Sequence, residues 1–486
     1  MIDEERARLQ KLGDLRKLGL DPYPLRVERS HTTAHALADF LALEKSGQEI
    51  KVVGRLRSIR IQGKAGFAHL EDGSGRLQIY CKNDILGAEA YQQFKNYYDV
   101  GDLVQVTGTV FITHKGEKTI QARSLTMLTK TLLPLPEKWH GLSDVETRYR
   151  QRYLDLLANP EVKDLFIKRS LMITALREFL NERGFLEVET PVLQSLAGGA
   201  TARPFVTHHQ ALDTDLYLRV APELYLKRLL VGGFEKVYEI ARCFRNEGID
   251  FSHNPEFTQV EFYAAYEDYQ SLMTLTEELL IALVRRVTGG LTVLFEGQEI
   301  SFVPPYPRLK FREVLLQYAE IDIGKLSDRD ALAREAKKRG LVIAKSDGYG
   351  KLCDELYKKF VRPHLIQPTF LIDHPVELSP LAKQRQDNPR YVERFQLIVG
   401  GTYELCNAFS ELNDPLEQAA RFKGQEELRR EGDEEAQPAD QDFVTALKYG
   451  MPPAAGFGMG LDRLANVLTG THSIKEAILF PTLRPK

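Results

Sequence analysis

The chain has 486 residues, of which 43% are hydrophobic and 27% are charged, and this ordinary globular composition argues against overall disorder. Its length predicts two domains with connecting segments. The 65 Lys and Arg residues against 68 Asp and Glu residues leave a formal net charge of −3. This balance argues against non-specific coating of nucleic acid, so a nucleic-acid partner would have to be met by local basic patches.

The cysteines and the apolar segments indicate the compartment. Four scattered cysteines form no CxxC pair: Cys81, Cys243, Cys353 and Cys406. They predict buried thiols in a reducing compartment. The first residues carry mixed charge without an apolar signal region, and the longest apolar runs, such as 279–284, are too short to cross a bilayer. We therefore expect a soluble, cytoplasmic protein that does not span a membrane.

The N-terminal third of the chain changes its hydrophobic period. Residues 1–48 place leucines at helical spacing, interrupted by the turn-like DPYP, and predict a short helical arm. Residues 49–132 instead contain five short segments of period two, separated by Gly, Asp and Ser. This pattern predicts a small closed β-barrel, with the OB-fold as the leading option. A proline-rich linker is expected at 133–144.

The remainder, 145–486, alternates helical and strand patterns. Helices are expected at 162–183, 269–287 and 414–431, and strands at 234–245, 255–266 and 395–409. Because neighbouring strands are joined by hairpins, the pattern excludes an all-parallel arrangement and predicts an α+β domain with a mostly antiparallel sheet flanked by helices. The acidic segment 430–442 is expected to be a solvated loop, and no inserted domain is expected.

One predicted hairpin is rich in polar and aromatic residues. Its first strand ends at Arg245, and its loop holds Glu247 and His253. Because side chains alternate along a strand, four residues of the return strand share one face: Phe257, Gln259, Glu261 and Tyr263. In isolation such a strand is more often a solvated sheet face. An arginine at a strand end beside a loop of donors, however, is suited to bind two phosphate oxygens at once.

The segment 400–414 has a second polar pattern. Asn407, Phe409 and Glu411 share one strand parity, whereas Glu404 has the other. Burying these polar groups in a strand is costly unless they have partners, so the pattern predicts a ligand or a metal ion.

The segment GFGMGLDRL has glycine at every second position. Gly456, Gly458 and Gly460 leave one strand face bare, and Arg463 lies in the helix that follows. A bare backbone face allows close approach of a ligand, and a helix N-terminus favours an anion. The pattern alone is weak because many turns and bulges share it. Glu223, at a predicted helix start, is by itself an ordinary first-turn residue.

Together these segments resemble the signature motifs of class II aminoacyl-tRNA synthetases. GFLEVETPVL at 184–193 resembles motif 1, which forms the dimer interface in that class. FRNEG at 244–248 with the hairpin resembles motif 2, and GFGMGLDR at 456–463 resembles motif 3. Beyond the class motifs, four segments resemble the lysyl-tRNA synthetase family, in the subgroup that also contains the aspartyl and asparaginyl enzymes: GGATARPFVTHH, APELYLK, FRNEGIDFSHNPEFT and NAFSELND. The resemblance covers the chain from about Ile50 onward.

This resemblance implies a ligase that forms lysyl-adenylate from L-lysine and ATP with Mg²⁺, and transfers lysine to the 3′-terminal adenosine of tRNA(Lys), as a homodimer. The implied catalytic residues are Arg245, His253 and Arg463. The implied ATP-binding residues are Arg245, Glu247, His253, Phe257, Glu404, Gly460 and Arg463. The implied lysine-binding residues are Gly199, Glu223, Arg245, Glu261, Tyr263, Asn407, Phe409, Glu411 and Gly458.

The implied metal site departs from the family pattern. The family carries two spaced glutamates there, but this chain has Gln396 at the first position, and the segment up to Glu404 is one residue longer. Gln396 can offer only a neutral amide oxygen. Glu404 is therefore the expected Mg²⁺ ligand, the number of bound ions stays open, and ATP and water can supply much of the coordination.

The barrel resembles the anticodon-binding domain of the same subgroup. The expected anticodon contacts are Arg55, Phe67, Gln78 and Glu117. Single-stranded RNA is held by basic groups and by aromatic rings that stack on bases. A core position for Phe67, with solvated arginines beside it, is an equally open interpretation.

Two alternatives remain. Glu223 and Glu411 oppose an aspartyl- or asparaginyl-tRNA synthetase, because an aspartate pocket must present cations to a carboxylate. Arg245, His253 and Arg463 oppose a catalytically silent paralogue that binds RNA or a partner. Amino-acid-dependent exchange of pyrophosphate into ATP distinguishes all three hypotheses.

Overall fold

The computed structural model describes residues 3–136, 142–196, 198–200, 202–344, 347–430 and 438–485. The chain divides into two compact units. The first contains Met1–Ser143 and Tyr153–Ala158, and the second contains Asp144–Arg152 and Asn159–Lys486. Of the predicted linker, 137–141 lie outside the described residues. No helix of the described part is both long enough and apolar enough to span a membrane.

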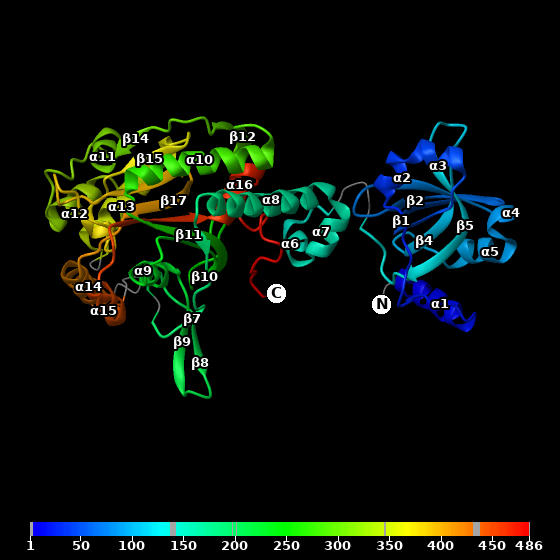
Figure 1. Cartoon of the computed structure of the whole chain (residues 1–486), viewed down its shortest axis with the longest axis horizontal. Coiled ribbons are helices and arrows are strands. Elements are labelled where there is room, and N and C mark those ends of the chain that lie inside the picture. Colours follow the sequence, from blue (N-terminus) through cyan, green and yellow to red (C-terminus); the bar gives the residue numbers. More distant parts are fainter. Residues whose placement is uncertain are drawn as a thin grey trace. The chain divides into compact units, whose positions relative to one another are not determined.

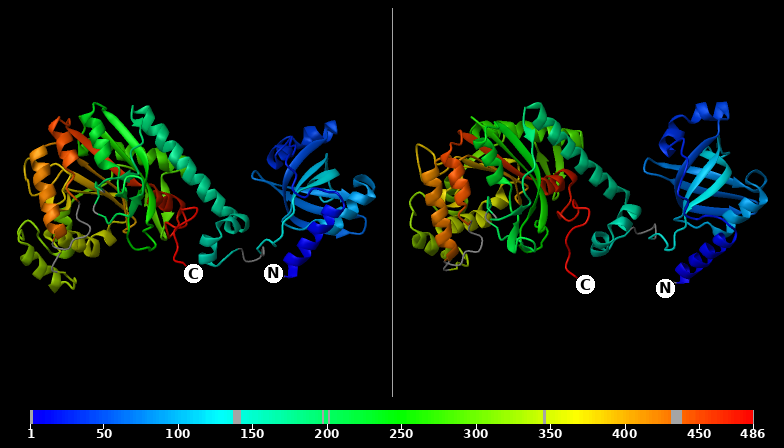
Figure 2. Two further views of the ribbon diagram at one scale, coloured as in Figure 1. Left: turned by 90° about the horizontal axis from the view of Figure 1, so that it is seen from below. Right: turned by 60° about the horizontal axis from the view of Figure 1, so that its bottom comes forward.

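Strands of the first unit close into a barrel in the order β1-β2-β3-β5-β4, and Figure 2 shows them curving around their core in blue and cyan. They are β1 (Ile50–Gln62), β2 (Ala65–Glu71), β3 (Arg76–Lys82), β4 (Leu103–Ile112) and β5 (Lys118–Thr129). Burial alternates along β2, as the period of two predicts. The closed barrel is therefore confirmed. Two short helices that the sequence did not indicate, α4 (Asn83–Leu86) and α5 (Ala88–Tyr97), lie between β3 and β4.

The predicted N-terminal arm packs on this barrel. It contains α1 (Asp3–Lys17), α2 (Thr33–Ala38) and α3 (Phe40–Ser46). Leu15 and Phe40 belong to the same buried core as the barrel strands.

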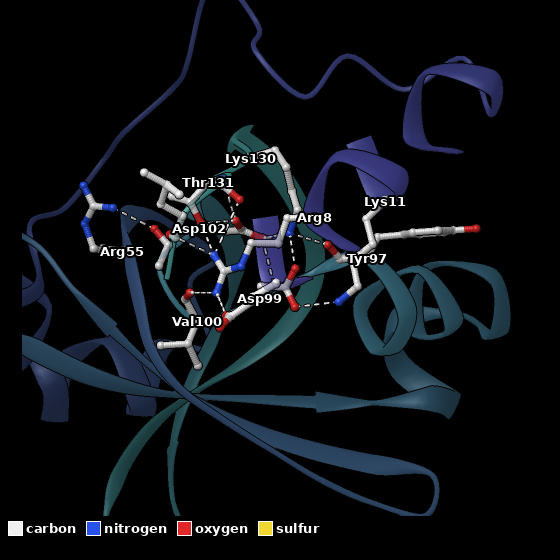
Figure 3. A network of polar contacts seen from close by, with 12 residues as sticks. Arg8, Lys11, Arg55, Tyr97, Asp99, Val100, Asp102, Lys130 and Thr131 are labelled. Carbon is white, nitrogen blue, oxygen red and sulfur yellow. Dashed lines mark hydrogen bonds and ion pairs between the residues drawn. The ribbon is translucent and has the colours of Figure 1, made fainter. Parts of the chain in front are cut away.

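A polar network reinforces this packing, as Figure 3 shows. Lys11 Nζ lies 2.5 Å from Oδ1 of Asp99. Lys130, whose side chain is fully buried, places Nζ 2.5 Å from Oδ2 of Asp99 and 2.8 Å from Oδ2 of Asp102. Arg8 Nη1 donates to Thr131 Oγ1 at 2.7 Å. The arm is thereby a structural part of the barrel unit.

The second unit is built on a sheet of order β14-β15-β16-β17-β18-β11-β10-β6. Its strands are β6 (Leu186–Glu187), β10 (Lys236–Phe244), β11 (Glu256–Ala265), β14 (Arg308–Lys310), β15 (Thr369–Ile372), β16 (Arg394–Val399), β17 (Tyr403–Ser410) and β18 (Ala454–Gly460). Only β6–β10 and β14–β15 are parallel pairs in this sheet. The predicted α+β class with a mostly antiparallel sheet is confirmed.

One face of this sheet is covered by helices α8 (Pro160–Glu182), α10 (Tyr269–Thr288) and α16 (Leu461–Thr469), and α8 and α10 run side by side in Figure 1. Phe262 and Phe457, which stack with centroids 4.4 Å apart, lie in the core beneath them. The helix predictions at 162–183 and 269–287 are confirmed. The single strand predicted at 395–409 is wrong, because Gly400 and Gly401, both with positive φ, turn the chain from β16 into β17.

Other elements were not predicted. Helices α11 (Phe311–Ala319), α12 (Arg329–Lys338) and α13 (Tyr349–Phe360) lie between β14 and β15 and share a second core with residues of β15 and β16. Two small sheets are formed by β7 (Leu193–Gln194), β8 (Val206–His209) and β9 (Thr214–Leu218), and by β12 (Thr292–Phe295) and β13 (Gln298–Ser301). The remaining helices are α6 (Val145–Arg150), α7 (Arg152–Ala158), α9 (Glu223–Val231), η1 (Arg362–His364), η2 (Val376–Leu378), α14 (Pro415–Arg430) and α15 (Gln441–Lys448).

The predicted acidic loop is corrected at its C-terminal end. Residues 431–437 lie outside the described residues. Asp440, however, is buried, caps α15, and accepts a hydrogen bond from Arg228 Nη2 at 2.8 Å. This end of the segment is therefore structured by an ion pair and a helix start.

Candidate active site

The three central strands of the sheet form the floor of a cavity of about 300 Å³. In the middle strand β18, Gly458 pairs with Glu261 of β11 on one side and with Asn407 of β17 on the other. Gly456 likewise pairs with Tyr263 of β11 on one side and with Phe409 of β17 on the other. A glycine strand thus separates two rows of polar and aromatic side chains.

The two central glycines serve different purposes. A Cβ atom on Gly456 would lie 2.1 Å from Oε1 of Glu411 and 2.4 Å from Cε1 of Tyr263, so a side chain cannot be accommodated there without displacing them. A Cβ atom on Gly458 would come no closer than 3.6 Å to Cγ of Glu261. Gly456 therefore permits packing within the protein, whereas Gly458 leaves open space at the cavity floor.

The cavity brings together most of the predicted site residues. Those lining it are Gly199, Glu223, Arg245, Glu247, His253, Phe257, Glu261, Tyr263, Glu404, Asn407, Phe409, Gly458, Gly460 and Arg463. Glu411 and Gln396 do not line it.

Glu404 reaches the cavity because of a β-bulge. The register of β17 against β16 shifts by one residue between Asn407 and Glu404. Leu405 and Cys406 both belong to the core on the opposite face. Glu404 therefore returns to the face of Asn407, and the expectation from simple alternation that it would have the other orientation is wrong.

The predicted polar face of β11 is confirmed. Gln259 Nε2 donates to Oε1 of Glu261 at 2.6 Å, and Tyr263 Oη donates to Oε2 at 2.9 Å. Burial, with a smaller contribution from the nearby Glu223 carboxylate, raises the pKa of Glu261 to about 8. Glu261 is thus a fixed, desolvated carboxyl group whose ionised form gains from a cationic ligand.

The hairpin loop presents a cation and an imidazole. Arg245 lies over the Phe257 ring, with its Cζ 5.0 Å from the ring centroid, and its buried Nε has no hydrogen bond within the described residues. His253 Nδ1 lies 2.9 Å from Oδ2 of Asp250. Partial burial alone would raise the pKa of Asp250, but hydrogen bonds from His253 and the Ser252 amide hold it below its ordinary value. The ring is therefore oriented by an ionised carboxylate.

Two further arginines lie at the β17 side of the cavity. Arg463 Nη1 donates to the carbonyl of Glu404 at 3.0 Å. Arg394 Nε donates to Oδ1 of Asn407 at 2.7 Å, and its Nη1 donates to Oγ of Ser379 at 2.9 Å. Because its oxygen is occupied, Asn407 has its amide N–H groups left for a ligand. The sequence did not single out Arg394; its strand parity, shared with Gln396, was the available signal.

Glu411 is held within a carboxylate cluster behind the cavity wall. It is only 1% exposed, lies just after β17, and forms an ion pair with Lys227 of α9. Lys227 is fully buried, and its Nζ lies 2.5 Å from Oε1 of Glu223. The sequence did not identify Lys227, although it follows Glu223 at the helical i,i+4 spacing.

The side chains fit a metal ion held by one carboxylate. Gln396 is turned to the buried His374, with its Oε1 3.2 Å from Nε2 of that ring. Within the described part of the chain, no three His, Cys, Asp or Glu side chains are arranged to hold a metal. Glu404 is thus the acidic group of the predicted metal site that lines the cavity. This arrangement suits Mg²⁺ coordinated mainly by phosphate and water.

On the barrel, three predicted anticodon contacts lie on one outer face. Gln78 Nε2 donates to Oε2 of Glu117 at 2.6 Å, and His69 Nε2 lies 3.0 Å from Oε1 of Glu117. Phe67 is half-buried, lies outside the barrel core, and packs on Tyr80 with ring centroids 4.7 Å apart. The core interpretation of Phe67 is therefore wrong.

Arg55 lies farther along the strands, away from Phe67. It pairs with Glu71, and its Nη1 donates to the carbonyl of Gly101 at 2.7 Å; Figure 3 shows it beside the polar network. A bulge near Arg57 shifts the register of β1, so that Arg60 is the residue directly opposite Phe67. Arg60 was missed because the alternation was counted through the bulge.

An antiparallel sheet with an arginine-bearing hairpin, a glycine strand and a following helix with an inward arginine defines a nucleotide-binding domain of the class II synthetase type. The chain belongs to the family of class II tRNA synthetases of the D, K and N group, whose profile matches residues 144–484. The profile of the OB-fold nucleic acid binding domain matches residues 50–128.

Curated relatives are similar over nearly their whole length. The chain is 51% identical over 483 residues to a protein named Lysine--tRNA ligase from Pelotomaculum thermopropionicum, covering 99% of this chain and 95% of that protein. It is 52% identical over 480 residues to the protein of that name from Moorella thermoacetica, covering 99% and 97%. It is 50% identical over 485 residues to the one from Chloroflexus aurantiacus, covering 100% and 99%.

Proposed function

We propose that the chain activates L-lysine with ATP and transfers it to tRNA(Lys). The observation that carries this proposal is a cluster of three buried carboxyl groups, in which Glu223 and Glu261 line the cavity and Glu411 lies directly behind its wall. An amino acid with two ammonium groups is the ligand that such a cluster stabilises, whereas a carboxylate side chain would be repelled. The names of the relatives agree with this choice.

The nucleotide would bind along the hairpin. Phe257 offers a ring on which adenine stacks, and Arg245 can bridge the α-phosphate and the amino-acid carboxylate. His253, oriented by Asp250, and Arg463 supply hydrogen-bond donors for the β- and γ-phosphates. Glu247 and Gly460, which also line the cavity, complete the proposed ATP site.

Activation needs no protein nucleophile. The lysine carboxylate attacks the α-phosphorus in line and pyrophosphate leaves. The protein's contribution is to align the two reactants and to stabilise the developing charge with Arg245 and Arg463. Glu404 would hold Mg²⁺, which neutralises phosphate charge when bound. Transfer follows when the 3′-hydroxyl of the terminal tRNA adenosine attacks the adenylate carbonyl and AMP leaves.

Lysine itself would be held by residues that the protein has already oriented. Gln259 and Tyr263 fix Glu261, and Arg394 fixes Asn407. Gly199, Phe409 and Gly458 supply the remaining walls of the cavity. Because these groups need not reorganise when the ligand binds, lysine is favoured over amino acids that would leave a buried carboxylate unpaired.

The barrel would read the anticodon. Phe67 supplies a stacking surface, Gln78 and Glu117 supply hydrogen-bonding groups, and Arg60 supplies the adjacent positive charge that was expected of Arg55. Stacking of a base on an aromatic side chain contributes roughly 1–3 kcal/mol.

Exposed apolar side chains support a homodimer. In and beside the motif 1 segment, Leu186, Val192 and Leu193 are 48%, 39% and 47% exposed, and Ile167 of α8 is 58% exposed. Exposed large apolar residues in a segment that resembles the dimer motif of the class are expected at a protein interface. A single species of twice the monomer mass by light scattering is expected. The buried free cysteines suit a cytoplasmic location.

The test is ATP–pyrophosphate exchange with each of the twenty amino acids, with Arg245→Ala as the inactive comparison. Exchange with lysine alone is expected. Exchange with aspartate or asparagine would identify the other members of the group, and absence of exchange with every amino acid would indicate a silent paralogue.

A further inference from the structure

Lys227 places an ammonium group of the protein inside the carboxylate cluster of the proposed lysine pocket. It lies one turn after Glu223 on α9, and its side chain has no exposed surface. Nζ lies 2.5 Å from Oε1 of Glu223 and forms an ion pair with Oε2 of Glu411. The rings of Phe409 and Phe443 flank it, with centroids 5.2 Å and 5.9 Å from Nζ.

The surroundings keep this ammonium charged. Burial alone would lower the pKa of Lys227, but Glu223 and Glu411 raise it above its ordinary value. The same pairing acts on the acid, because burial raises the pKa of Glu411 and the Lys227 charge opposes that rise. Without Lys227, a carboxyl group that is 1% exposed would have no cation beside it within the described residues and would favour its neutral form.

The charges of the pocket then match those of a diamino acid. Glu223, Glu261 and Glu411 carry three negative charges when ionised, and Lys227 balances one of them. Two are left, which equals the number of ammonium groups on lysine, while Arg245 can balance the substrate's carboxylate. A pocket without Lys227 would have one negative charge too many for this substrate.

The ion pair also determines which oxygen of Glu411 is available. Oε2 forms the ion pair with Lys227, whereas Oε1 has neither an ion pair nor a hydrogen bond in the part of the chain that the structure describes. Oε1 lies directly over Gly456, where a Cβ atom would be only 2.1 Å away, and Gly456 lines the cavity. The free oxygen is thus next to the space in which an amino-acid side chain would end.

We propose that Lys227 is a positioning residue that determines specificity: its ammonium holds Glu223 and Glu411 so that the free oxygen of Glu411 is presented to the ε-ammonium of the amino acid. This inference rests on the proposed lysine activation. Lys227 does not line the cavity, so its effect is expected on lysine recognition and not on the chemical step.

The test uses Lys227→Met and Lys227→Arg in the full chain. Exchange kinetics without tRNA give the KM for lysine and for ATP separately, and norleucine, which lacks the ε-ammonium, measures specificity. The matched control is Lys130→Met, because Lys130 is likewise fully buried between two carboxylates, Asp99 and Asp102, but lies in the barrel unit (Figure 3). Melting temperatures are recorded for every variant.

We expect Lys227→Met to raise the KM for lysine roughly 100-fold or more, as loss of one partner of a buried ion pair predicts. The KM for ATP should be unchanged, the preference for lysine over norleucine should shrink, and Lys227→Arg should be intermediate. Lys130→Met should lower the melting temperature without changing either KM.

An unchanged KM for lysine in folded Lys227→Met would overturn the proposal, and so would tighter lysine binding, which would mean that Lys227 competes with the substrate. If Lys227→Met does not fold, Lys227→Arg decides: a raised KM for lysine alone supports the proposal, and native lysine kinetics overturn it. If the unsubstituted chain activates no lysine, the proposed function fails instead, so the two failures are distinguishable.

Discussion

Gly456→Ala should disable lysine recognition while leaving the nucleotide site intact. The added methyl group would lie 2.1 Å from Oε1 of Glu411 and 2.4 Å from Cε1 of Tyr263. Relief requires displacements of more than about 1 Å, since carbon contacts are favourable near 3.5–4.0 Å. Neither neighbour can move easily, because Glu411 is paired with Lys227 and the Tyr263 hydroxyl donates to Glu261.

The expected cost has two parts. Overpacking of this kind destabilises the fold by about 1–3 kcal/mol, and a misplacement of about 1 Å at a reacting site lowers the rate on the order of 100-fold. The assay is exchange with lysine as the varied substrate, beside a titration of ATP binding. Gly424→Ala is the matched control, because a Cβ atom at this position of α14 would meet nothing within 4 Å. A folded Gly456→Ala protein with native kcat/KM for lysine would refute the packing argument.

Three further outcomes are expected. Because the pKa of Glu261 in the free protein is raised to about 8, and the ionised form binds an ammonium, kcat/KM for lysine should rise with pH and level off above about 8. Tyr263→Phe should move that inflection upward, since the hydroxyl lowers the pKa of Glu261, and a profile flat from pH 6 to 9 would contradict both statements. Gln396→Glu should lower the Mg²⁺ concentration needed for half-maximal exchange only if the new carboxylate turns from His374 to the cavity; an unchanged titration means that Glu404 and the nucleotide suffice. Arg60→Ala should raise the KM for tRNA in aminoacylation without altering exchange, whereas an equal or larger effect of Arg55→Ala would contradict the placement of Arg60 beside Phe67.

Regular alternation made the polar face of β11 predictable and failed where a strand contains a bulge. Along β11 no register shift intervenes, so Gln259, Glu261 and Tyr263 lie together as expected. In β17 the inserted residue reverses the orientation expected for Glu404. A bulge depends on how two strands pair, and the sequence of one strand does not show its register against the other. Its position could therefore not be predicted. The bulge in β1 has the same effect, because it places Arg60 opposite Phe67, where regular alternation from Arg55 would not.

Glu411 shows a different limit of inference from sequence. The three carboxylates of the pocket come from a helix start, a central strand and the residue after another strand, and each segment alone allows an ordinary structural interpretation. Only the folded sheet brings Glu223 and Glu411 to the same lysine side chain. The buried ammonium between them lowers the number of substrate cations that the cluster can neutralise. That number depends on the net charge of the pocket and not on its carboxylates alone. The amino acid that the pocket selects is therefore determined by the net charge of the folded pocket, to which Lys227 contributes as much as any of the three carboxylates.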